Sequence, residues 1–346
     1  MRKLASFLLG IALPLALGAC NASTQPSTTP QQQRPGYPQQ PYPQQPYPQQ
    51  PYPQQPYPQQ PYPQQPQPQQ PQQPAQRPLL APLVGMTAWQ NELRGVLNEL
   101  LNALNPTNQA MVRGIPLVFD PTLEINAYAG CDEQGSPFLA ATSGILEAID
   151  AIAQTKATDE LFGTHTYDAY CNAVLPQVVS SDKAHAGLPA GIIPANLGGD
   201  LRRWSRAHEM FDELLAFTFG HELGHHYLGH TGCAKGQGNG AGPDPGNLGR
   251  LFLRVPLFNQ GAEASADSAG CYNSLDAGRA RRPQFEWSEN GGLTLLDYFA
   301  RLERAAGQGG IQGLLNPLNV LKTHPNPLAR IPLLQTVART WHQQHP

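Results

Sequence analysis

The chain has 346 residues and a formal net charge of −3 at pH 7, from 22 basic and 25 acidic side chains. The basic residues form no cluster, which argues against a nucleic acid as partner. Many of the 37 prolines lie in residues 21–82, so the composition of the whole chain misrepresents the part that can fold. Residues 83–346 remain, enough for one domain with a large apolar core.

The first residues have the pattern of a secretory signal peptide. Arg2 and Lys3 precede an apolar run that ends at Leu17 and is too short for a typical membrane span. The sequence Leu17-Gly18-Ala19-Cys20 resembles the lipobox of bacterial lipoproteins. This resemblance implies that residues 1–19 are a lipoprotein signal peptide and that Cys20 carries the lipid that anchors the chain to a membrane. The alternative is an ordinary secretion signal with an incidental cysteine.

The residue after the cysteine bears on where the protein is sorted. Asn21 stands where an aspartate would suggest retention at the inner membrane. We therefore expect a lipid-anchored protein of the bacterial cell envelope, with the outer membrane favoured and the folded domain periplasmic or surface-exposed. The mature chain, without its two signal-peptide cations, carries a charge of −5.

Residues 20–82 contain the lipidated cysteine and a low-complexity tether. The unit YPQQP recurs every five residues from Tyr37 to Tyr62. Proline at this density favours polyproline II and cannot bury a core. We interpret the segment as a spacer between the membrane and the domain; the alternative is a ligand for a proline-binding partner. No protein partner can be identified from the sequence.

The first half of the domain predicts a helix and a small sheet. Apolar residues recur at helical spacing over residues 89–104, which predicts a helix that packs in the core. Short apolar runs at residues 115–119, 126–129 and 137–142 predict three strands, and a second helix begins near Ile145. Residues 155–207 show no clear period and receive no assignment. His165 and His185 fall in this stretch and are expected to be surface or core residues rather than ligands.

The second half is predominantly helical. Residues 208–230 form an apolar helical pattern, and polar groups on such a buried helix need partners, for which a metal is one candidate. Residues 232–250 are rich in Gly, Pro and Asn and predict a mobile surface loop. Further helices are predicted at residues 260–274, 293–304 and 328–342.

Four cysteines remain if Cys20 is lipidated, and an even number in an exported chain suggests two disulfides. Three pairings are possible. The favoured one joins Cys131 to Cys171 and Cys233 to Cys271.

The sequence HELGHHYLGH at residues 221–230 holds the candidate metal site. Residues four apart share a helix face, so His221 and His225 can bind one ion. Glu222 then lies beside the ion, where it can act as general base toward water. The metzincin frame fails, because Leu228 replaces its glycine and Thr231 its third histidine. His226 points elsewhere, and His230 is out of that frame.

A third ligand is required, which leaves one position for water. Glu263 lies 38 residues beyond His225, and Asp267 follows one helical turn later on the same face. Glu263 can bind the metal while Asp267 accepts a hydrogen bond from a ligand histidine. The alternative interpretation of this pair is a solvated acidic face.

Four separated motifs resemble metallopeptidase family forty-eight, which includes the heat-shock membrane protease HtpX and the CAAX prenyl endopeptidases. They are Asn126-Ala127-Tyr128 with the following PFLAATSGIL, HELGH, EASADSAG and THPNPLARI. The resemblance covers about residues 83–340. It implies an α+β, mainly α, gluzincin-type domain, in which PFLAATSGIL contains an edge strand that takes the substrate in extended form.

The resemblance also implies roles for individual residues. One Zn2+ per chain is bound by His221, His225 and Glu263, with Glu222 as base. His324 stabilises the oxyanion. Arg330 fixes the local structure through an ion pair or, as an alternative, contacts the substrate, and Asn126 positions the substrate backbone. The chain departs from the family in lacking membrane-spanning helices and tetratricopeptide repeats, and residues 155–207 look like an insertion.

Two functions follow from these patterns. The first is a zinc-dependent endopeptidase that hydrolyses proteins or peptides of the cell envelope. The second is a non-catalytic metal-containing lipoprotein that binds envelope proteins as a quality-control module. The intact Glu222 distinguishes them, because a binding module has no use for a base beside the water.

Overall fold

The computed structural model describes residues 82–83, 85–236, 242–245, 248, 260–281, 285–308 and 319–346. The signal peptide, Cys20 and nearly all of the tether therefore lie outside the described residues, as does much of the predicted loop at 232–250. All described residues belong to one compact unit, Pro71–Pro346. None of the helices within the described ranges combines the length and apolar character needed to cross a bilayer.

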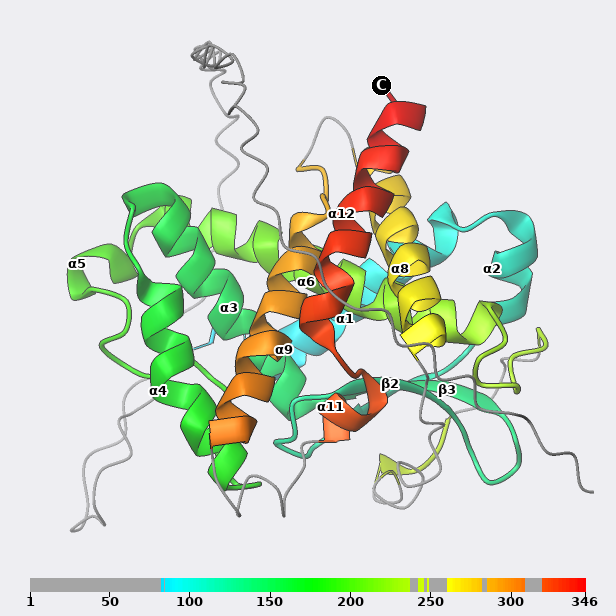
Figure 1. Ribbon diagram of the computed structural model, residues 1–346, viewed down its shortest axis with the longest axis horizontal. Coiled ribbons are helices and arrows are strands. Elements are labelled where there is room, and N and C mark those ends of the chain that lie inside the picture. Colours follow the sequence, from blue (N-terminus) through cyan, green and yellow to red (C-terminus); the bar gives the residue numbers. More distant parts are fainter. Residues whose placement is uncertain are drawn as a thin grey trace, which may run out of the picture. The chain divides into compact units, whose positions relative to one another are not determined.

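The described part is mainly helical with a small sheet, which confirms the predicted α+β, mainly α class. Figure 1 shows the sheet lying along one side of the helices. The helices are α1 (Met86–Ala103), α2 (Pro106–Val112), α3 (Ser143–Phe162), α4 (Thr166–Ser180), α5 (Ala195–Gly198), α6 (Leu201–Tyr227), α8 (Gln260–Ala280), α9 (Asn290–Gln308), α11 (Asn319–Thr323) and α12 (Pro327–Gln344). The strands are β1 (Leu117–Asp120), β2 (Ala127–Cys131) and β3 (Pro137–Thr142).

The order of the strands corrects one prediction. The sheet runs β1-β3-β2, with β1 parallel and β2 antiparallel to β3. The strand of PFLAATSGIL is therefore central, not an edge. Its residues from Phe138 to Ala141 are fully buried, as expected for a strand with neighbours on both sides. The open edge nearest the histidine helix belongs to β2.

Helix α6 carries the histidines in its last two turns. It begins earlier than predicted, because the Asp200 side chain caps it by accepting from the backbone N–H groups of Arg202 and Arg203. It ends at Tyr227, before Gly229, whose φ of 81° is the left-handed conformation that terminates helices. Every residue from Phe211 to Tyr227 is buried, so the histidines lie inside the protein.

Helix α8 approaches α6 closely because small residues meet at the crossing. A Cβ atom placed on Gly270 would lie 2.7 Å from the backbone nitrogen of His221, and one on Gly220 would lie 3.1 Å from the Gly270 carbonyl oxygen. Only glycine allows this separation without movement of the backbone. The close crossing brings the first turns of α8 opposite the histidines of α6.

Residues 155–207, which received no secondary-structure assignment from the sequence, are also largely helical. This stretch contains the end of α3, all of α4 and α5, and the beginning of α6. Helix α4 buries one face at helical spacing, including Tyr167, Tyr170, Val174 and Val178, and exposes the opposite face. The period is therefore present in the sequence, although the alanines and Pro176 on the exposed face weaken its polar contrast. His165 precedes α4 at its N-cap, and the exposed His185 pairs with Glu147 at 2.9 Å. Neither histidine belongs to the metal-ligand groups found among the described residues.

The predicted disulfide pairing is wrong. Cys131 bonds to Cys233, with their Cα atoms 6.1 Å apart, whereas Cys171 and Cys271 are free and buried. Cys131 ends β2 and Cys233 follows α6, so the two meet where the edge strand passes the end of the histidine helix. The bond ties the edge strand to that end. Cys171 lies within α4 and Cys271 within α8, where apolar neighbours bury their thiols.

Candidate metal centre

Three predicted ligands converge at one point. His221 Nε2 lies 3.0 Å from His225 Nε2, and the Glu263 carboxylate lies 3.2 Å from His225 Nε2 and 3.6 Å from His221 Nε2. Ligands about 2.0–2.1 Å from a tetrahedral ion stand about 3.3 Å apart, which agrees with these separations. With His324 the three form a buried group whose ligand atoms all lie within 4.8 Å of one another. The cluster can therefore hold a metal ion.

The hydrogen bonds around this group leave free the nitrogen and oxygen lone pairs that would bind a cation. His221 Nδ1 lies 3.0 Å from the Asp267 carboxylate, so a neutral His221 that donates from Nδ1 keeps a lone pair at Nε2. Glu263 Oε1 is buried and has no hydrogen-bond partner. A buried acceptor without a donor, beside two imidazole nitrogens, is the arrangement that a bound cation satisfies.

The protonation states of the ligands also suit a cation, which requires neutral imidazole and ionised carboxylate. Burial lowers the pKa of His225 to about 3, which keeps the ring neutral. Burial alone would raise the pKa of Glu263, but His324, His225 and His221 together hold that pKa well below its usual range. Glu263 is therefore ionised, and the neutral His225 ring lies 3.2 Å from its Oε1.

Arg330 pairs with Glu263 and Asp267 of α8, which agrees with the ion pair that the family resemblance implies. Its guanidinium donates to both oxygens of Asp267, at 2.7 and 2.6 Å, and pairs with Glu263 Oε2 at 2.9 Å. Burial alone would raise the pKa of the Asp267 carboxyl. The hydrogen bonds from Arg330 and His221 outweigh this effect and hold the pKa below its ordinary value. Asp267 is wholly buried, so it is not the solvated acidic face of the alternative interpretation.

His230 is the residue that the sequence analysis missed. Its Nδ1 lies 2.9 Å from His225 Nδ1, and its Nε2 lies 3.3 Å from the Ser265 hydroxyl. His230 is thus the outer partner of His225, as Asp267 is of His221. The signal available in the sequence was a histidine just after a helix-ending glycine, where the chain can turn back. His226 points away, with its ring nitrogens near the Phe138 carbonyl and the Thr231 hydroxyl.

Glu222 lies beside the cluster without being part of it. Its Oε1 is 4.0 Å from His221 Nε2 and 3.6 Å from His324 Nε2, and its Oε2 has no hydrogen-bond partner. Burial raises its pKa, while His324, His221 and the backbone N–H of Ala129 oppose that shift. A buried carboxylate with a raised pKa and an open oxygen can accept a proton from water.

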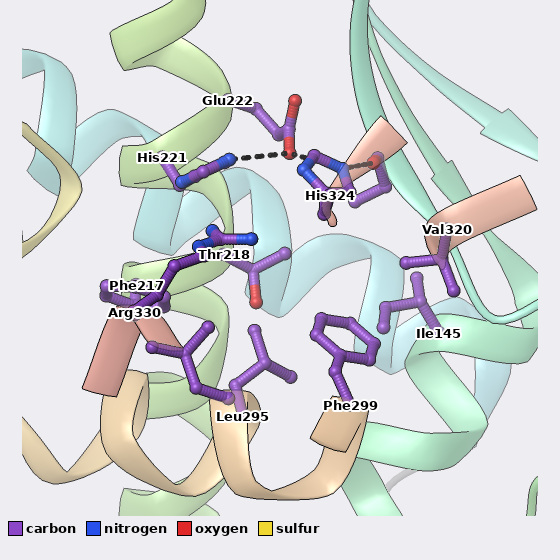
Figure 2. A pocket seen from close by; sticks show the side chains of 12 residues that line it. Ile145, Phe217, Thr218, His221, Glu222, Leu295, Phe299, Val320, His324 and Arg330 are labelled. Atoms are coloured by element: carbon purple, nitrogen blue, oxygen red, sulfur yellow. Dashed lines mark hydrogen bonds and ion pairs between the residues drawn. The ribbon is translucent and has the colours of Figure 1, made fainter. Parts of the chain in front are cut away.

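His324 reaches the site from the short connection between α11 and α12. Its Nδ1 lies 3.0 Å from Glu263 Oε2 and its Nε2 lies 3.4 Å from the carbonyl oxygen of Ala127 on β2. Burial alone would lower its pKa, but the Glu263 carboxylate raises that pKa to about 8. The ring is thus a cationic donor near neutral pH, and Figure 2 shows it beside Glu222 and His221.

Asn126 lies immediately before β2 and is fully buried. Its backbone N–H donates to the Thr142 hydroxyl, and its side-chain amide lies 3.5 Å from the Glu124 carboxylate. The residue fixes the start of the edge strand. Contact with substrate stays a prediction.

A second group of possible ligands lies between α1 and α6. It comprises Glu92, His208 and Asp212. Here the Arg281 guanidinium already lies 3.5 Å from the Asp212 carboxylate, and the Glu92 and His208 side chains are more than a third exposed. The buried group on α6 and α8 is therefore the stronger candidate.

Comparisons with models of protein families, with curated proteins and with solved structures found no match.

Proposed function

We propose that the chain is a zinc-dependent endopeptidase of the bacterial cell envelope, anchored through lipid on Cys20, with proteins or peptides as substrates. The observation that carries this proposal is the convergence of His221, His225 and Glu263, with Glu222 beside them. Two imidazoles and one carboxylate are a set typical of catalytic zinc, which keeps a further position open. The resemblance to metallopeptidase family forty-eight supports the same assignment.

Zinc bound by these ligands would lower the pKa of water and polarise a peptide carbonyl. Glu222 accepts the proton of the attacking water and passes it to the leaving nitrogen. Its burial excludes competing solvent, and its unpaired Oε2 is free to take the proton. His324 donates toward the oxygen on which negative charge develops, and its raised pKa keeps a proton available near neutral pH.

Strand β2 offers a template for an extended substrate. Residues 126 and 142 form a hydrogen-bonded pair, with the Thr142 N–H donating to the Asn126 carbonyl. Pairing alternates along an antiparallel ladder, so the backbone groups of Ala127 and Ala129 point to the open side. The contacts of these groups agree with that orientation. The Ala127 carbonyl oxygen lies 3.4 Å from His324 Nε2, and the Ala129 N–H contacts the Glu222 carboxylate. A peptide added at this edge would lie along the metal centre.

Replacing Glu222 with Gln tests the proposal, because it removes the base and keeps the shape. We expect the variant to retain zinc by elemental analysis and to lose cleavage of an unfolded casein-type substrate by at least 100-fold. Glu209→Gln, on a more exposed part of the same helix, is the matched control and should keep full activity. If Glu222→Gln cleaves as fast as the parent, the non-catalytic binding role is the better account.

A further inference from the structure

The disulfide between Cys131 and Cys233 joins two elements that border the metal centre. Cys131 is the last residue of β2, and Cys233 follows shortly after α6, which ends at Tyr227. The sulfur of Cys131 also lies 3.3 Å from the carbonyl oxygen of Thr231. The bond therefore holds the short turn after α6, residues 228–233, against the end of the edge strand.

The same turn carries His230, the outer partner of the candidate ligand His225. The backbone N–H groups of His230 and Thr231 both donate to the His225 carbonyl oxygen, at 2.9 and 3.4 Å, so the chain folds back over the last turn of α6. This places His230 Nδ1 2.9 Å from His225 Nδ1. The two rings stay in contact only while the turn keeps this shape.

The hydrogen bonds of His230 suit a supporting role toward His225. A histidine that binds zinc through Nε2 carries its proton on Nδ1 and donates it to an outer partner, which fixes the orientation of the ligand ring. His230 Nδ1 accepts that proton if its own proton is on Nε2, where the Ser265 hydroxyl of α8 lies 3.3 Å away and can accept. The turn thus contributes directly to the support of the metal ligand.

A second and weaker link fastens the turn to the sheet. The Thr231 hydroxyl lies 3.0 Å from His226 Nδ1, and His226 Nε2 lies 3.0 Å from the Phe138 carbonyl oxygen on β3. Such hydrogen bonds contribute about 0.5–1.5 kcal/mol each, whereas a disulfide opens only by reduction or thiol exchange. Cys131 is partly exposed, so an external thiol can reach the bond. Its cleavage would leave the turn held by the weaker link.

From these contacts we infer that the Cys131–Cys233 disulfide positions His230 against His225, so that the chain binds zinc tightly only after this bond has formed. The inference rests on the proposed function and adds regulation to it: the site is weak in a reducing compartment and complete in an oxidising one such as the cell envelope. As the S–S bond forms, the two thiols lose two protons and two electrons. The disulfide of a thiol oxidoreductase accepts the electrons and becomes a dithiol.

Zinc affinity tests the inference without reference to cleavage. Competition with a chromophoric chelator compares the oxidised parent with Cys131→Ser/Cys233→Ser, which can neither form the bond nor offer a thiolate to the metal. We expect the serine pair to bind zinc about 10- to 100-fold more weakly, the size of effect that loss of an outer partner produces. Cys171→Ala removes a free, buried thiol of α4 and is the control; it should bind zinc like the parent.

A double-mutant cycle tests whether the bond acts through His230. In a His230→Ala background, the serine pair should weaken zinc binding by less than about twofold further, because the positioned ring is already absent. A disulfide that only stabilised the fold would weaken binding by the same factor in both backgrounds, and this result would overturn the inference. If the serine pair does not fold, zinc release is followed after phosphine reduction of the folded, zinc-loaded parent and His230→Ala proteins.

The outcomes separate the inference from the proposed function. Equal zinc affinity with and without the bond would overturn the inference and leave the endopeptidase proposal standing. Zinc binding that depends on the bond, without any cleavage activity, would support the inference and reject the endopeptidase. Unfolding by both routes would overturn the inference, because the bond would then hold the fold and not the site. An oxidised parent that binds no zinc would overturn both.

Discussion

Replacing Arg330 with alanine should destabilise the protein more than the loss of any exposed ion pair among the described residues. The guanidinium makes two hydrogen bonds to Asp267 and one ion pair with Glu263, and both carboxylates are fully buried. Removal of one partner from a buried ion pair costs about 3–5 kcal/mol, because the remaining charge is left without compensation. We expect a loss of this size in the metal-free protein.

Zinc should recover part of that loss. A cation in the cluster would compensate Glu263, and a ligand at 100 times its Kd adds about 2.7 kcal/mol to stability. The assay is urea unfolding followed by circular dichroism, with chelator and with excess zinc. The Arg202→Ala variant removes a largely exposed ion pair with Asp200 and should unfold like the parent. A metal-free Arg330→Ala protein within about 1 kcal/mol of the parent would refute the reasoning.

Two further predictions concern groups outside the ligand set. His230→Ala should weaken zinc affinity by about 10- to 100-fold because His225 loses its outer partner, and His230→Gln should recover part of the affinity. Competition with a chromophoric chelator measures the affinity, and an unchanged value in His230→Ala would show that His230 does not have this role. Burial raises the pKa of Asp150 to about 6 against the opposing hydrogen bonds from Leu83 and Gln154, so the native state retains a proton that the unfolded state releases near pH 4. Stability should therefore fall by roughly 2 kcal/mol as pH rises from 4 to 6, out of roughly 3 kcal/mol over the whole transition. Asp150→Asn should abolish that pH dependence in denaturant titrations, and an equal slope in both proteins would contradict it.

The features that could be predicted from the sequence are those that depend on local residue patterns. Helical spacing of apolar residues located α1 and most of α6, helices were also predicted at the positions of α8, α9 and α12, and three short apolar runs located the strands. The positions of the two candidate ligands on α6 were also predictable, because residues four apart on a helix face the same way. Glu263 was recognisable as an acid one turn before Asp267 in a segment that resembles a known family.

The predictions that failed concern contacts between segments that are far apart in the sequence. The bond between Cys131 and Cys233 spans 102 residues, and no spacing rule selects it among three pairings. The central position of β3 is a property of strand order, which follows from the packing of whole elements. His230 contacts His225 only because α6 ends at Tyr227 and the chain turns back at Gly229, a conformation that the histidine-rich sequence alone does not reveal.

The composition of the metal shell tests the account most directly. Metal content and zinc-edge X-ray absorption should be measured on the purified parent and on Glu263→Ala. We predict one zinc per chain in the parent, with two imidazoles and oxygen ligands in a four-coordinate shell at about 2.0–2.1 Å, and retention weakened at least about tenfold in the variant. A parent that binds no stoichiometric zinc, or a variant with the same content and the same shell, would contradict the account.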